Sequence, residues 1–97
     1  MSGARGEPVE GAAPLRVVII DDHEVLRAGT RQVLETTDDI VVVGEAESWD
    51  TALRAIEELS PDVALVAILL SGRNGNDLAR LLSTVHPGTR VVILSAY

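Results

Sequence analysis

The chain has 97 residues, of which 46% are apolar and 24% charged, a size and balance that fit one globular domain. No apolar stretch reaches membrane-spanning length and the N-terminus lacks the apolar segment of a signal peptide, so a cytoplasmic location is the default. A net charge of −7 argues against nonspecific binding to nucleic acid or anionic membranes, and the lack of cysteine excludes disulfides and thiolate metal sites.

The first 14 residues contain three glycines, two prolines and almost no large apolar side chain. Such a segment buries too little surface to offset the entropy lost on ordering, so we expect a disordered tail. The apolar run at residues 17–20 predicts a buried strand that ends in Asp21-Asp22. A helix over about residues 24–36 follows, with Asp22 able to cap its start.

The remaining segments alternate between strand and helix. A strand is expected at about residues 40–44, and Ser48 caps a helix that Ser60-Pro61 ends. A third strand runs to Ala67, a third helix ends at His86-Pro87-Gly88, and a fourth strand follows at about residues 90–94. The expected buried helical positions are Leu26, Thr30, Val33 and Leu34 in the first helix, Trp49, Ala52, Leu53 and Ile56 in the second, and Leu78, Leu81, Leu82 and Val85 in the third.

This alternation with short loops implies right-handed crossovers and a parallel sheet of strand order 2-1-3-4. One helix should cover one face, and the other two helices the opposite face. The carboxyl ends of the first and third strands then meet at one edge of the sheet, where open α/β folds bind ligands. Ala67 should therefore face Asp21 and Asp22 across a shared cleft, with no third acid present.

Five segments, in this order, resemble the receiver domain of bacterial two-component response regulators, particularly those with a LuxR/NarL-type DNA-binding domain. They are residues 15–24, 42–46, 61–66, 72–75 and 90–96. The resemblance covers roughly residues 15–97 and implies a flavodoxin-like (CheY-like) three-layer α/β sandwich. Since such receivers continue with a fifth strand and two further helices, we expect residues 15–97 to be a partial receiver, unstable or oligomeric alone, or a fragment of a longer protein.

The resemblance also assigns site residues. It implies that Asp21 and Asp22 are the magnesium ligands, that position 67 is the phosphoacceptor and a further ligand, and that Ser95 is the switch hydroxyl. Ala67 can neither accept a phosphoryl group nor bind a cation through its side chain, so we expect a weak or absent Mg²⁺ site. Two other departures lie nearby: the loop at residues 67–72 has lost the family's proline, and Asn76 replaces an apolar residue. The chain also has no lysine, so the family's phosphoryl-pairing lysine is missing.

The functional interpretation is a degenerate receiver: a signalling module rather than an enzyme, unable to be phosphorylated at the usual position. Its expected partners are a histidine kinase, another receiver or a fused output domain, with a homodimer possible and any DNA contact made by a separate domain. Two alternatives stay open, namely a nonfunctional truncated product and a small Mg²⁺-dependent phosphohydrolase using Asp21 as nucleophile.

Simpler interpretations exist for single residues. The acid pair can be a helix cap beside a solvated acid. His23 is better explained by a structural or exposed role than by metal ligation, since no second histidine lies at ligand spacing. Glu45 and Glu47 are interpreted as surface acids near the cleft.

Overall fold

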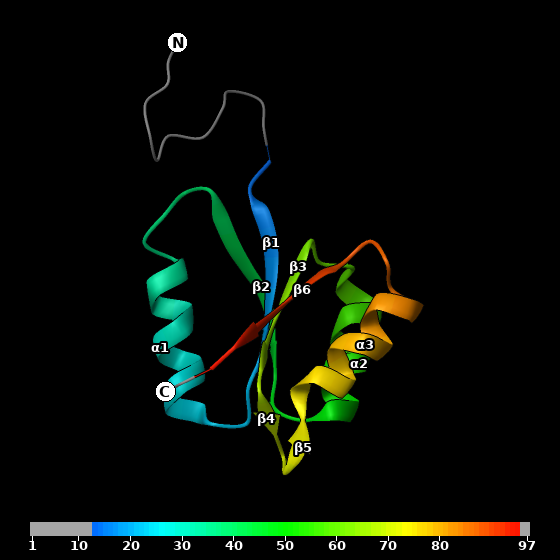
Figure 1. Ribbon diagram of the computed structural model, residues 1–97. Coiled ribbons are helices and arrows are strands. Elements are labelled where there is room, and N and C mark those ends of the chain that lie inside the picture. The colour runs from blue at the N-terminus through cyan, green and yellow to red at the C-terminus, as the bar shows by residue number, and fades with distance from the viewer. Residues whose placement is uncertain (1–12, 96–97) are drawn as a thin grey trace.

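The computed structural model describes residues 13–95 and forms a parallel sheet with helices on both faces (Figure 1). The sheet order is β2-β1-β3-β6, and every neighbouring pair is parallel. Because β6 is the strand predicted as the fourth, this order confirms the predicted order 2-1-3-4. Residues 1–12 of the expected disordered tail lie outside the described range. The elements are β1 (Leu15–Ile20), α1 (Glu24–Leu34), β2 (Ile40–Ala46), α2 (Trp49–Leu59), β3 (Val63–Ala67), β4 (Leu69–Leu70), β5 (Arg73–Asn74), α3 (Gly75–Val85) and β6 (Arg90–Leu94).

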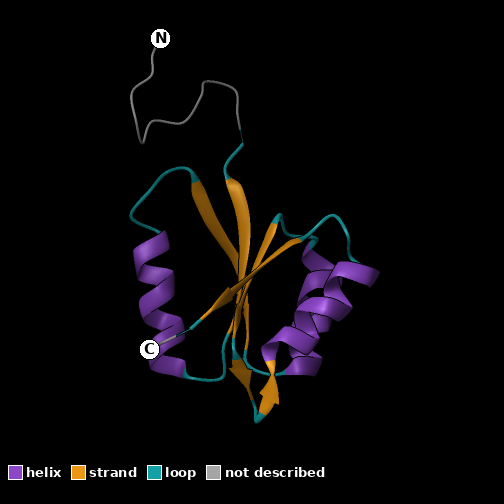
Figure 2. Cartoon of the chain, viewed as in Figure 1, coloured by secondary structure: helices purple, strands orange, loops and turns teal. Residues whose placement is uncertain are grey.

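Helix α1 lies on one face of the sheet, and α2 and α3 lie together on the other, so the three predicted layers are present (Figure 2). The larger core lies between the sheet and the α2/α3 layer, and the smaller one lies beneath α1. Val17 to Ile20 of β1 are at most 3% exposed, because this central strand is covered on both faces. The buried members of the larger core are Val18, Ile20, Ala46, Ala52, Ile56, Ala64, Val66, Leu70, Leu78 and Leu82.

The apolar positions of α1 are much less buried than the sequence predicts. No residue of α1 is buried, and Val33 and Leu26 are 68% and 45% exposed, so their assignment to the core is wrong. Among the residues described, α1 is the only helix on its face, and its contact with the smaller core comes from Leu34 in its last turn. Val92 and Leu94 of β6 are each 40% exposed. A wide apolar surface is therefore left beside α1.

Helices α2 and α3 begin at side-chain caps, as their sequences favour. The Ser48 side chain accepts a hydrogen bond from the Thr51 backbone N–H, and the Thr51 side chain accepts one from the Ser48 N–H, forming a capping box. Asn74 caps α3 by accepting from the Asn76 N–H. Of the positions predicted to be buried in α2, Ala52 and Ile56 are fully buried. Of those predicted in α3, Val85 is 51% exposed, because it is the last residue of the helix.

Strand β2 contains a bulge opposite β1. Val17 pairs with Val42 but Val18 pairs with Gly44, so Val43 is an extra residue on β2. The extra residue reverses the alternation of side chains beyond it. Glu45 consequently contacts α1, while Ala46 packs in the core on the α2/α3 face.

A short antiparallel hairpin, β4–β5, follows β3 and was not predicted. Ser71 and Gly72 form its two-residue turn, with φ of 52° and 78°. Positive φ at both central residues matches the twist of the flanking strands. Figure 1 shows this hairpin projecting beyond the carboxyl edge of the sheet, where the predicted site lies.

Candidate functional site

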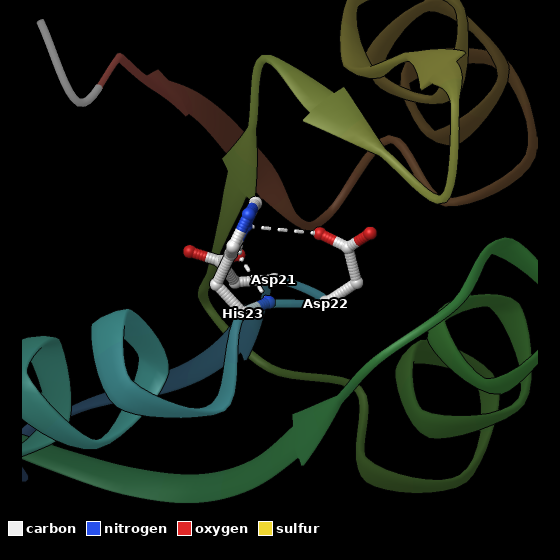
Figure 3. Close-up of side chains that lie close together, drawn as sticks. All are labelled: Asp21, Asp22 and His23. Atoms are coloured by element: carbon white, nitrogen blue, oxygen red, sulfur yellow. Dashed lines mark hydrogen bonds and ion pairs between the residues drawn. The ribbon is translucent and has the colours of Figure 1, made fainter.

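The turn after β1 is organised around the two aspartates. The Asp21 carboxylate accepts a 2.9 Å hydrogen bond from the His23 backbone N–H. The His23 imidazole, 66% exposed, places Nδ1 3.4 Å from Asp21 Oδ1 and 3.3 Å from Asp22 Oδ1 (Figure 3). The His23 ring is exposed, as expected, but it also lies between the Asp21 and Asp22 carboxylates.

Asp22 does not cap α1, so that part of the sequence interpretation is wrong. The N-cap residue is His23, and its side chain makes no capping hydrogen bond. The Asp22 carboxylate instead accepts a 2.8 Å hydrogen bond from the Ser71 backbone N–H at the hairpin turn. Within the turn itself, the Asp21 carboxylate and not that of Asp22 accepts a backbone N–H, that of His23.

A cavity of about 410 Å³ brings together three of the four sequence-predicted site residues, whereas Asp22 is not part of its lining. Asp21, Ala67 and Ser95 all line it, at the carboxyl ends of β1, β3 and β6. The rest of the lining is mostly apolar: Leu26, Ile68, Leu69 and Leu94, with Thr30 and His23. A larger groove of about 870 Å³, between α3 and β6, contains none of the predicted site residues.

The end of β3 is held closely by the start of α3. The Gly75 N–H donates a 2.7 Å hydrogen bond to the Ile68 carbonyl. A Cβ atom at Gly75 would lie only 2.0 Å from the Ala67 carbonyl oxygen, so no larger residue fits without movement of the backbone. Glycine at position 75 therefore allows α3 to begin directly against the strand that carries position 67.

Glu45 is more than a surface acid, because it joins β2 to α1. Arg27 Nε donates a 2.7 Å hydrogen bond to Glu45 Oε1, and Arg31 donates to Glu45 Oε2. The Arg31 hydrogen bond, opposed by desolvation and supported by Arg27, holds the pKa of the Glu45 carboxyl below its ordinary value. Arg27 also donates to the Asp21 carbonyl oxygen at 2.6 Å, so this cluster fixes the backbone of the acid turn.

The donor set at the acid pair fits a magnesium site only in part. Ligand atoms of Asp21, Asp22 and His23 lie within 4.8 Å of one another, which a divalent cation requires. Magnesium, however, needs oxygen ligands in octahedral geometry, and Ala67 contributes no side-chain oxygen. Between residues 13 and 95, every buried side-chain nitrogen or oxygen has a hydrogen-bond partner, so no orphaned donor or acceptor points to a missing ion.

Comparison with known proteins gives one consistent family. Residues 17–97 match the model of the response regulator receiver domain. The response regulator GacA of Pseudomonas viridiflava is 36% identical over 81 residues, which are 84% of this chain and 38% of that protein. The chain spans about two fifths of the length of the curated relatives that it matches.

Solved structures agree. The signal receiver domain of NarL from Mycobacterium tuberculosis superposes with a TM-score of 0.81 at 35% identity, covering 89% of this chain and 69% of that one. A LuxR-family two-component response regulator from Aurantimonas sp. gives a TM-score of 0.80 at 27% identity, with 87% and 60% covered. The family match over residues 17–97 includes β6, and Ser95, which lines the cavity, directly follows that strand.

Proposed function

Because this chain belongs to the response regulator receiver domains of the LuxR/NarL type, we propose that it is a signalling module that works by binding rather than by accepting a phosphoryl group. The observation that carries the proposal is the composition of the cavity at the carboxyl edge. It joins Asp21, Ala67 and Ser95, and the residue at the end of β3 has only a methyl group.

Phosphoryl transfer to a protein requires a nucleophilic side-chain atom, an oxygen, nitrogen or sulfur, at the point of attack. A methyl group has neither a lone pair nor a charge, so no acyl phosphate forms at position 67. Ser95 lies at the same cavity, but its proposed role as a switch hydroxyl depends on a phosphoryl oxygen to bind. A module built this way keeps one signalling state unless a partner changes it.

We also propose that Asp21 and Asp22 bind Mg²⁺ weakly or not at all. Removing one carboxylate about 4 Å from a cation forfeits on the order of 4 kcal/mol per cation charge at an effective dielectric near 20. A net loss of about 2.8 kcal/mol already weakens affinity roughly a hundredfold. Asp22 is further engaged by the Ser71 N–H, which draws on the same carboxylate.

The partners proposed for this segment are a histidine kinase, another receiver domain or a second copy of the chain. Relatives that match the chain are named as response regulators and transcriptional regulatory proteins. Transcription regulation is accordingly the proposed role of the complete protein, with DNA contacted by a separate domain because this segment carries a net charge of −7. No helix among residues 13–95 combines the length and apolar character needed to cross a membrane.

An alternative is a small Mg²⁺-dependent phosphohydrolase in which Asp21 attacks. Asp21 lines the cavity and its side chain is 15% exposed, so a substrate can reach it. Its Oδ1 already accepts from the His23 N–H, and the chain contains no lysine to offset phosphate charge. The signalling module is therefore favoured, and the chain's being a nonfunctional fragment is the remaining alternative.

The test is phosphorylation by acetyl phosphate with Mg²⁺, followed by intact mass and peptide mapping. We expect no adduct on the wild-type chain or on Ala67→Asn, which matches aspartate in size but lacks its charge. Ala67→Asp should gain an aspartyl phosphate and bind Mg²⁺ at least about a hundredfold more tightly. An adduct on wild-type protein would contradict the proposal, and turnover through Asp21 would support the phosphohydrolase.

Binding is tested separately by pulldown with a panel of histidine kinases, with intact receiver domains and with a tagged second copy of the chain. Retention of the wild-type chain that does not depend on acetyl phosphate is the expected result. Failure to bind any kinase, receiver or second copy would favour the nonfunctional fragment.

A further inference from the structure

The β4–β5 hairpin is fixed by contacts with two other segments, the acid turn after β1 and the start of α2. The Ser71 N–H donates to Asp22 Oδ2 at 2.8 Å, and the Ser71 hydroxyl donates to the Glu47 carbonyl at 3.4 Å. On the same hairpin, the Arg73 guanidinium lies over the Trp49 ring, 3.7 Å from its centroid. The hairpin therefore contacts the acid turn at one point and the start of α2 at another.

The turn geometry explains why a donor is available for Asp22. Leu70 pairs with Arg73 across the ladder, and Ser71 and Gly72 between them have φ of 52° and 78°. In a two-residue turn of this kind, the N–H of the first central residue takes no part in the flanking ladder pair. Asp22 supplies the acceptor, with a side chain that is 30% exposed, and a charged acceptor makes the bond stronger than a neutral one.

The base of the hairpin is anchored independently of the tip. Leu70 is fully buried in the larger core, and the Gly75 N–H donates to the Ile68 carbonyl at the far end of the hairpin. The base thus stays with the core, while contacts with Asp22, Glu47 and Trp49 decide where the tip lies. Because only Gly72 separates Ser71 from Arg73, displacement of one contact acts on the other.

We propose that the β4–β5 hairpin connects Asp22 with Trp49 at the start of α2. Whether the Asp22 carboxylate accepts the hydrogen bond from the Ser71 N–H determines whether Arg73 covers the Trp49 ring. When Asp22 holds the Ser71 N–H, Arg73 lies over the Trp49 ring. When Asp22 is withdrawn, the tip moves and the ring is uncovered. This coupling uses neither a phosphoryl group nor position 67, so it stands apart from the function proposed above.

The chain has a built-in reporter for this motion, because Trp49 is its only tryptophan. Acrylamide quenching of its fluorescence measures how well Arg73 covers the ring, and hydrogen exchange of the residue 71 amide measures the bond to Asp22. The comparison uses the wild-type chain, Asp22→Ala and Asp22→Asn, with Arg73→Ala marking the fully uncovered ring.

We expect Asp22→Ala to raise amide exchange at residue 71 by about tenfold or more, the effect of losing one charge-assisted hydrogen bond. Its Trp49 quenching should rise toward that of Arg73→Ala. Asp22→Asn retains a carbonyl acceptor and should stay near the wild type in both measurements. Unchanged exchange at residue 71 in Asp22→Ala would overturn the proposal, as would faster exchange with Trp49 quenching left at the wild-type value.

A second pair of variants keeps the test decisive if Asp22→Ala does not fold. Both variants lose the long 3.4 Å hydrogen bond from the Ser71 hydroxyl to the Glu47 carbonyl, so they differ only in the backbone. Ser71→Gly retains the N–H and tolerates positive φ, whereas Ser71→Pro has no N–H and a fixed φ near −65°. Quenching of Trp49 should rise in Ser71→Pro and remain at the wild-type level in Ser71→Gly. Equal quenching in the two variants would refute this connection.

Discussion

The contact of Gly75 with the end of β3 makes a quantitative prediction for Gly75→Ala. The added methyl carbon would lie 2.0 Å from the Ala67 carbonyl oxygen, whereas close C–H···O contacts span about 3.3–3.6 Å. The start of α3 must then move away by more than about 1 Å. Overpacking of this kind costs about 1–3 kcal/mol, and loss of the 2.7 Å hydrogen bond from Gly75 to Ile68 costs about 0.5–1.5 kcal/mol. We expect a total loss of about 1.5–4.5 kcal/mol.

The assay is urea unfolding followed by Trp49 fluorescence and circular dichroism. Gly29→Ala is the matched control, because Gly29 lies within α1 and a Cβ atom there would meet no other atom within 4 Å. Alanine in the interior of an exposed helix should stabilise the chain by about 0.5–1 kcal/mol. The reasoning is refuted if the two alanine variants have the same free energy of unfolding, since only the contact with Ala67 separates them.

Three further predictions concern stability. The pKa of Glu45 is lowered, chiefly by the hydrogen bond from Arg31. The ionised Glu45 side chain therefore contributes to the free energy of unfolding above pH 4.5, its ordinary pKa, and this contribution is lost as the pH falls through the lower folded-state pKa. In urea unfolding at neutral and acidic pH, Glu45→Gln should consequently lose less stability on acidification than the wild type. Ser48→Ala removes the capping box of α2 and should cost about 1 kcal/mol in the same assay, while an unchanged midpoint would contradict the cap. Ile56→Ala, at a fully buried position, should cost about 2–5 kcal/mol, whereas Val25→Ala, 83% exposed, should stay within about 0.5 kcal/mol.

The sheet was predictable because its strands carry strong local patterns. The apolar run that ends at Ile20 is buried on both faces, and such runs identify central parallel strands without tertiary information. Ser48 and Pro61 mark the ends of α2 through their own backbone chemistry, and the structure agrees at both. Proximity of the strand ends then follows from topology, which is why Asp21, Ala67 and Ser95 meet at one cavity.

The hairpin and its contacts depend on information that periodicity does not carry. Strands β4 and β5 have two residues each, too few to show alternation. The sequence does contain a turn signal in the Ser71-Gly72 pair, but this pair fits an irregular loop as well as a hairpin turn. Asp22 was misassigned because a carboxylate before a helix favours a cap, and the competing Ser71 N–H comes from 49 residues away.

Burial in α1 was overestimated for a different reason. Its helical spacing is correct, but spacing shows which side of a helix is apolar and not whether another element covers it. Val33 lies on the apolar side and is still 68% exposed, since only the end of α1 near Leu34 reaches the core.

The bulge at Val43 has a consequence for insertions and deletions in β2. With strict alternation along β2, Glu45 would lie in the apolar core beneath α2 and Ala46 would face the arginines of α1. The single surplus residue changes the parity of the strand, so an acid reaches its counter-charges on one side while a methyl group fills the other. Deleting Val43 should therefore leave Glu45 and Ala46 on their present sides, because the pairs Val17 with Val42 and Val18 with Gly44 would then follow one another without a shift.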